Sequence, residues 1–113
     1  MMVKQMIVPQ YSFEDLDTFD EAVERLNSDR ELVANRILEA VRYGLKNNLL
    51  SVYLFELKIS SDKIYAVKCK REEWKSSLNN SRKFFESIEE YEKCAQVRDL
   101  ILELEHSEIA VQI

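Results

Sequence analysis

The chain has 113 residues, of which 46% are hydrophobic and 33% are charged, and its formal net charge is −5 at pH 7. This length and apolar content are those of one folded domain with its own core, and they exclude a disordered polyampholyte. Gly44 and Pro9 are the only residues of their kinds, so the sequence has no Gly-rich phosphate loop and no flexible linker, which excludes P-loop and Rossmann nucleotide-binding domains.

The sequence contains no stretch near the roughly 18 consecutive apolar residues that a membrane-spanning helix needs, and residues 1–5 lack the apolar core of a signal peptide. We therefore expect a protein of the cytoplasm, in a bacterium or a phage-infected host cell, with no membrane partner. Cys69 and Cys94 form no closely spaced metal-binding motif. In a chain without a secretion signal, both are expected to be free, buried thiols.

The N-terminal quarter predicts a strand followed by a helix. Val3–Val8 is short, apolar and followed by Pro9, a pattern typical of a strand. Ser12 with Asp15 resembles a helix N-cap, and apolar residues then recur at steps of three and four. These features indicate an amphipathic helix over residues 13–26, and its other face is acidic.

A second helix is expected directly afterwards. Ser28 and Glu31 repeat the capping pattern, and an apolar stripe at steps of four residues continues to about Asn48. Because only a short link separates the two helices, residues 12–48 are predicted to form a helical hairpin.

Residues 50–70 change to a period of two, which is typical of strands. One face of the first strand is expected to carry Tyr53, Phe55, Leu57 and Ile59, and the other face Val52, Leu54, Glu56 and Lys58. The polar run at 60–63 suits a turn, and the alternation resumes from Tyr65 to Cys69. The segment therefore predicts a β-hairpin.

Residues 72–105 predict a second helical hairpin. Trp74–Phe85 carries an apolar stripe that is interrupted near Ser81. Ser87 and Glu90 offer a third capping pattern, so the last helix is expected to start between them. Its buried face is expected to hold Tyr91, Ala95, Ile101 and Leu104.

The predicted order of elements is β-αα-ββ-αα, with a weakly alternating tail at 109–113 that favours one further strand. This order indicates a single α+β domain in which two helical hairpins pack on a small antiparallel sheet. The sequence has no internal repeat of the kind found in solenoids.

The sequence offers no convincing constellation for catalysis. His106 is the only histidine, and an exposed histidine after a helix is the simpler interpretation than a Ser–His–Asp or Cys–His site. The carboxylates lie mainly on the expected solvent faces of helices, where they need no catalytic explanation. Glu89, Glu90 and Glu92 are close in sequence, but nothing fixes the geometry that a metal ion would require. We predict a protein that is not an enzyme and has no cofactor and no metal.

Charge is distributed unevenly along the chain. Residues 58–83, the basic segment, contain 8 basic and 3 acidic side chains, whereas residues 84–113 contain 2 and 8. Lysines and arginines interleaved with aromatic residues are typical of surfaces for single-stranded nucleic acid. The candidate residues for such a surface are Lys68, Lys70, Arg71, Trp74 and Lys75. Because acidic segments flank them and would repel phosphate, we do not expect a high-affinity nucleic-acid site.

The segment 91–104 runs Tyr-Glu-Lys-Cys-Ala-Gln-Val-Arg-Asp-Leu-Ile-Leu-Glu-Leu. It resembles the second helix of the UVR motif, which has the pattern aromatic-Glu-x-small-Ala-x-aliphatic-Arg-Asp-x-Ile-x-x-Leu. The resemblance extends over about residues 74–104, with Trp74–Phe85 as a poorly matching first helix. Glu89 also departs from the motif, which usually has an aliphatic residue there.

The UVR motif is a two-helix hairpin that docks on other proteins in nucleotide-excision-repair subunits and in a protein-arginine kinase activator. The resemblance implies the same kind of docking here. It implies no nuclease, helicase or kinase activity, because those activities belong to other domains of the family members.

Together these features favour a small, non-catalytic adaptor or regulator, such as a phage or bacterial accessory protein, that binds a protein through its C-terminal helical hairpin. A homodimer is one form that such binding takes. The residues expected to meet the partner are Tyr91, Arg98, Asp99, Leu100 and Leu102. Two alternatives are an RNA- or DNA-binding module that uses the basic segment, and a structural subunit of a larger assembly such as a virion.

Overall fold

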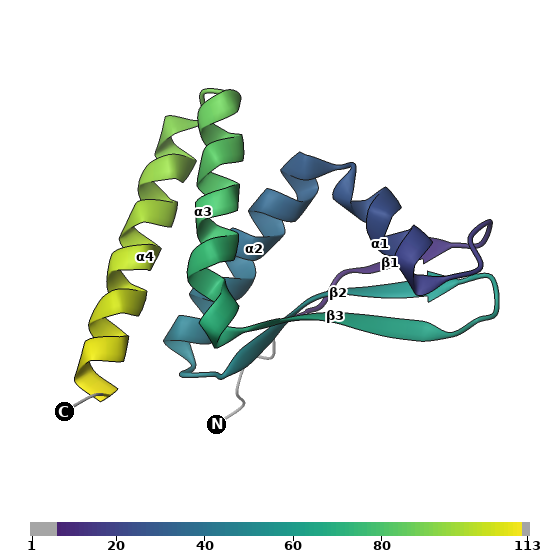
Figure 1. Ribbon diagram of the computed structural model, residues 1–113, viewed down its shortest axis with the longest axis horizontal. Coiled ribbons are helices and arrows are strands. Elements are labelled where there is room, and N and C mark those ends of the chain that lie inside the picture. Colours follow the sequence, from purple (N-terminus) through teal and green to yellow (C-terminus); the bar gives the residue numbers. More distant parts are fainter. Residues whose placement is uncertain (1–6, 112–113) are drawn as a thin grey trace.

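The computed structural model describes residues 7–111, with side chains through residue 108. Four helices and three strands follow one another in the order shown in Figure 1. They are β1 (Gln10–Phe13), α1 (Phe19–Asn27), α2 (Arg30–Lys46), β2 (Ser51–Ile59), β3 (Ile64–Lys70), α3 (Arg71–Ser87) and α4 (Tyr91–Val111). The predicted α+β class and the order β-αα-ββ-αα are confirmed.

The sheet has the strand order β1-β2-β3 and is mixed rather than antiparallel. The hairpin of β2 and β3 is antiparallel, as predicted, but β1 runs parallel to β2, with Gln10 opposite Glu56. A parallel pair needs a long crossover, and α1 and α2 together supply it. The antiparallel prediction is therefore wrong for β1.

The first strand lies later in the sequence than expected. It begins after Pro9, whose carbonyl oxygen accepts a hydrogen bond from the Glu56 amide at 2.9 Å. Of the predicted strand Val3–Val8, residues 3–6 lie outside the described residues, and residues 7–8 precede β1. The predicted strand is thus wrong where it can be compared, because the apolar run only leads into the residues that pair with β2.

The helix predicted over 13–26 begins only at Phe19, because Tyr11 and Phe13 continue the strand and pack against the core. Thr18, not Ser12, is the N-cap, and its side-chain oxygen accepts a hydrogen bond from the Glu21 amide at 3.2 Å.

The next helix, α2, starts one residue later than the capping pattern suggested. Asp29, rather than Ser28, caps it by accepting a hydrogen bond from the Leu32 amide at 3.2 Å. Figure 1 shows α1 and α2 as an open V above the strands rather than a closed hairpin.

The C-terminal helices form the predicted hairpin. Helix α3 is continuous through Ser81, which is buried, and does not break there as the sequence suggested. The turn at 88–90 is closed by a hydrogen bond from the Glu90 amide to the Phe85 carbonyl at 2.8 Å, with Glu89 in the left-handed region at φ 59°.

The tail prediction is also corrected. Helix α4 continues through residue 111, so no strand forms at residues 109–111, and residues 112–113 lie outside the described residues. The Ser87 hydroxyl donates to the Phe84 carbonyl at 2.6 Å and does not cap α4.

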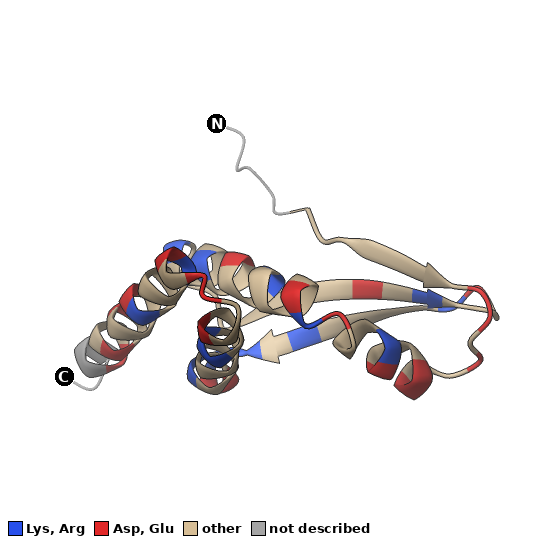
Figure 2. Cartoon of the chain, turned by 90° about the horizontal axis from the view of Figure 1, so that it is seen from above, with Lys and Arg blue, Asp and Glu red and all other residues tan. Residues whose placement is uncertain are grey.

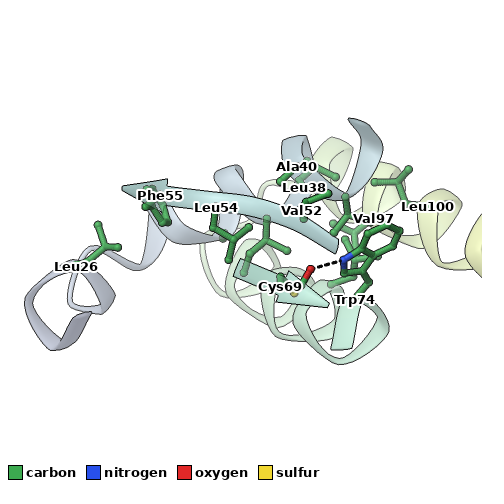
Figure 3. Packing of buried hydrophobic residues seen from close by; sticks show 14 of the residues in the cluster. Leu26, Leu38, Ala40, Val52, Leu54, Phe55, Cys69, Trp74, Val97 and Leu100 are labelled. Carbon is green, nitrogen blue, oxygen red and sulfur yellow. Dashed lines mark hydrogen bonds between the residues drawn. The ribbon is translucent and has the colours of Figure 1, made fainter. Parts of the chain in front are cut away.

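The largest completely buried side chain of the core is that of Trp74 (Figure 3). Its indole Nε1 donates a hydrogen bond to the carbonyl of Cys69 at 3.0 Å, so the one polar atom of the ring is satisfied. Gly44, the only glycine, lies on α2 opposite this ring. A Cβ at position 44 would lie 2.6 Å from the Trp74 ring and 2.7 Å from Val52. Helix α2 therefore approaches β2 and α3 so closely only because residue 44 has no side chain.

Strand β2 contains a bulge at Leu54. Tyr53 pairs with Lys68 and Phe55 pairs with Val67, which leaves Leu54 without a partner in β3. The extra residue reverses the alternation, so that Val52 and Leu54 are buried before the bulge and Phe55, Leu57 and Ile59 after it. The expectation that Tyr53 lies on one face with Phe55 is therefore wrong, and so is the expectation that Val52 and Leu54 share the opposite face with Glu56 and Lys58.

The guanidinium group of Arg36, from α2, binds this bulge. Arg36 is only 4% exposed. Its Nε donates to the Leu54 carbonyl at 2.6 Å, and a terminal nitrogen donates to the Tyr53 carbonyl at 2.9 Å. Glu39 lies 3.4 Å from the third nitrogen. Burial lowers the pKa of Arg36 below its usual value, with the Glu39 carboxylate opposing the shift, but an arginine stays charged across the physiological range.

We expect Gly44→Ala to destabilise the protein by about 1–3 kcal/mol, because the new methyl group overlaps Trp74 and Val52 in a packed core. By helix propensity alone, alanine would stabilise the helix by about 1 kcal/mol relative to glycine. A loss of stability would therefore come from the packing around residue 44. Urea denaturation measures the change. Lys46→Ala, an exposed site near the end of the same helix, serves as control and should change stability by less than about 0.5 kcal/mol. An unchanged or raised stability of Gly44→Ala would contradict the packing described.

We expect Arg36→Leu to cost about 2–3 kcal/mol, because two carbonyl oxygens at the bulge lose hydrogen bonds from a charged donor. Arg42→Leu is the matched control: Arg42 is exposed on the same helix and binds only Gln96 among the hydrogen bonds seen, so its loss should be nearly neutral. Equal unfolding midpoints for the two variants in a denaturant titration would show that the bulge does not depend on Arg36.

Candidate functional site

The residues predicted to meet a protein partner lie on α4, and four of the five are exposed. Tyr91 is 65% exposed and Leu102 is 49% exposed. Arg98 and Asp99 lie between them in sequence and form an ion pair with each other at 3.4 Å. We call Tyr91, Arg98, Asp99 and Leu102 the α4 surface.

Leu100 does not belong to the α4 surface. It is only 6% exposed and packs in the core with Val97, Ile101 and Leu104 (Figure 3). Tyr91, which was expected in the core, points to solvent instead. The two predictions fail for the same reason: α4 contacts both α3 and α2, and this places the centre of its buried stripe on Val97 and Leu104.

The basic segment does not form one continuous surface. Trp74 is buried and cannot stack on a base, which corrects its place among the nucleic-acid-binding candidates. Arg71 donates hydrogen bonds to the Leu49 carbonyl at 3.1 Å and to the Ser107 hydroxyl at 2.6 Å. Lys75 pairs with Glu105 at 2.9 Å, and this hydrogen bond raises the pKa of Lys75. These three side chains are thus engaged within the fold.

Lys68 and Lys70 remain available, and they lie on the sheet face that faces away from the helices. Strand pairing places Tyr53 beside Lys68 and Ser51 beside Lys70. Pairing and burial together define this open sheet face as Gln10, Ser12, Ser51, Tyr53, Glu56, Lys58, Ile64, Ala66, Lys68 and Lys70. Figure 2 shows basic residues along β2 and β3, and a concentration of acidic residues around α1. The sequence pattern missed Tyr53 as a member of this face because the bulge cannot be read from alternation.

A groove of about 730 Å³ lies between three parts of the chain. They are the link from α2 to β2, the junction of β3 with α3, and the last turns of α4. Leu50, Lys70, Arg71 and Ser107 contribute to its lining. Lys70 thus borders both this groove and the open sheet face.

Neither a metal-binding cluster nor a membrane-spanning helix occurs among the described residues. Between residues 7 and 111 no group of three or more histidine, cysteine or acidic side chains is placed to hold a metal ion. His106 is exposed on α4. Among the helices of that range, none combines the length and apolar character that crossing a bilayer requires.

Comparison of the chain with protein-family models, with curated proteins and with solved structures gives no match. The resemblance of residues 91–104 to the UVR motif therefore stays a prediction.

Both cysteines are free thiols, but they differ in accessibility. Burial raises the pKa of Cys69, although its contact with Ser77, with Sγ and Oγ 3.6 Å apart, opposes the shift. Cys94 is only partly buried between α3 and α4.

We expect a disulfide reagent at about pH 8 to label Cys94 in the native protein and Cys69 only after unfolding, because the exposed thiolate is the reactive species. Absorbance of the released thiol measures both rates, and the single variants Cys69→Ala and Cys94→Ala assign them. If folded Cys94→Ala protein were labelled as fast as folded Cys69→Ala protein, the burial of Cys69 would be wrong.

Proposed function

We propose that this chain is a non-catalytic adaptor or regulator whose α4 surface receives a helix of a partner protein. The observation that carries the proposal is the exposure of two large apolar side chains, Tyr91 and Leu102, on one outward stripe of a helix whose opposite stripe is fully packed. Large exposed apolar side chains grouped on one face are typical of protein-interaction sites.

The spacing of the stripe favours a helical partner. Tyr91, Ala95, Arg98 and Leu102 follow one another at steps of four, three and four residues. This is the spacing with which one helix presents a continuous seam to another in a coiled coil. Ala95, which is small and half-buried, allows a second helix to approach closely between the two larger side chains.

The charged pair in the middle of the surface supports the same proposal. Arg98 and Asp99 are adjacent in sequence and therefore point in different directions on the helix. Their contact at 3.4 Å is long, and both side chains are largely exposed. Such a pair contributes little to stability, so both groups are available for charged hydrogen bonds to a partner.

The UVR resemblance implies the same use of the hairpin formed by α3 and α4. In line with the expectations from sequence, we place the protein among small bacterial or phage accessory proteins that act in the cytoplasm. A second copy of the chain is one form that the partner helix can take.

To test the proposal, immobilised parent protein and two variants are compared for capture of proteins from a bacterial host lysate, followed by titration of each purified partner. We expect Leu102→Asp to weaken binding at least about tenfold, because it replaces an apolar contact residue with a charge. Leu50→Asp is the matched control, since Leu50 is also an exposed apolar residue but lies in the link between α2 and β2. Light scattering of each variant alone reports whether the partner is a second copy.

Circular dichroism must first show that both variants keep the helical content of the parent. Retention of every partner, and of the parent's solution mass, by Leu102→Asp would refute the α4 surface as the binding site. Equal loss for Leu102→Asp and Leu50→Asp would refute it as well.

A further inference from the structure

The described helices leave the open sheet face uncovered. Figure 1 shows α1 and α2 above the strands, and no described helix lies against their other side. Sheets of this size are often solvated on one face, and then they carry mixed polar residues. Here the face has a more specific composition: one exposed aromatic residue, three lysines and one glutamate.

The aromatic residue is Tyr53, and the bulge places it there. Regular alternation would put Tyr53 on the buried face with Phe55, but the unpaired Leu54 shifts the phase and leaves Tyr53 45% exposed. Bulges recur next to functional sites, where they redirect a side chain. The buried Arg36 holds this bulge through two carbonyl oxygens, so the position of Tyr53 is fixed by the interior of the domain.

Two of the lysines lie on the strand next to Tyr53. The Lys68 ammonium lies 5.1 Å from the centre of the tyrosine ring, and Lys70 follows two residues along the same edge strand. Lys58 is farther along β2, with its ammonium 3.5 Å from Asp62. Glu56 is the only acidic residue of the face.

From the sequence, the acidic segments on both sides of the basic segment were the reason not to expect a high-affinity nucleic-acid site. In the fold, these acidic segments lie away from the open sheet face. Most of the N-terminal acids are on and before α1, on the helical side of the sheet, and those of α4 belong to the helical hairpin (Figure 2). The open sheet face is therefore locally positive although the whole chain carries a net charge of −5.

We propose that the open sheet face binds single-stranded nucleic acid, with a base stacked on Tyr53 and phosphates held by Lys68 and Lys70. Stacking on an exposed aromatic residue combined with lysine–phosphate contacts is the general mode for single strands. A protein partner fits less well, because the centres of protein interfaces are depleted of lysine. A duplex also fits less well, since its bases are not free to stack on Tyr53.

The test is fluorescence anisotropy of a labelled oligo-deoxythymidine of about ten nucleotides, measured with full-length protein over a range of salt concentrations. We expect the parent to bind more tightly than about 100 µM at low salt. Lys68→Gln should weaken binding and reduce the slope of log affinity against log salt by about 0.7, the value for one lost phosphate contact with a single strand. Tyr53→Ala should weaken binding about tenfold and leave that slope unchanged, because stacking releases no counterions.

The matched control is Lys83→Gln, which removes the same charge from the same segment of sequence. Lys83 is exposed on α3, away from the open sheet face, so affinity and slope should stay close to those of the parent. Three results would each overturn the proposal: no binding at low salt, equal losses for Lys68→Gln and Lys83→Gln, or full affinity in Tyr53→Ala. Because the α4 surface is untouched by these variants, failure here leaves the proposed protein adaptor role to be judged by its own experiment.

Discussion

The arrangement of the sheet depends on one buried interaction. The Arg36 guanidinium donates hydrogen bonds to the carbonyl oxygens of Leu54 and Tyr53. A bulge leaves carbonyl groups without a partner strand, and inside a protein such groups must find another donor. Arg36 supplies two donors from the helix above. In this way a long, charged side chain from α2 decides which side chains of β2 enter the core and which face outward.

The second constraint on the fold is the close contact between Gly44 and Trp74. It brings α2, β2 and α3 together around one ring and leaves the rest of the sheet to be covered only by α1. The result is an open shape, with a radius of gyration of 15.3 Å, larger than the roughly 13 Å of a compact domain of this length. An open shape exposes more surface per residue, which is in line with the two binding surfaces that we propose.

Some elements of this structure could be predicted from the sequence and others could not. The difference depends on how far apart in sequence the interacting residues lie. The β-hairpin and the C-terminal helical hairpin join neighbouring segments, so alternation and apolar spacing were sufficient to predict them. The phase of β2 was not predictable in this way, because it depends on Arg36, which is remote in sequence. At the N-terminus, Thr18 with Glu21 has the same spacing as Ser12 with Asp15, and only the packing of Tyr11 and Phe13 against the core decides which of them caps the helix. On α4, Tyr91 was expected in the core and Leu100 on the surface, and the structure has them the other way round. The positions at which α2 and α3 contact α4 decide this, and the sequence of α4 alone does not contain them.

The parallel pairing of β1 with β2 has a consequence for how the chain folds. Gln10 pairs with Glu56, and both α1 and α2 lie between them in the sequence. By contrast, β2 pairs with β3 and α3 packs on α4, and in both cases the two elements are consecutive in the sequence. Contacts between distant residues carry the larger loop-closure entropy and tend to form late. A strand of four residues at the edge of a sheet also has few hydrogen bonds to hold it, so local opening should begin at β1. Release of β1 would uncover the edge of β2 while the remaining elements stay folded, giving the domain a partly open form that hydrogen exchange at the β1 amides would detect.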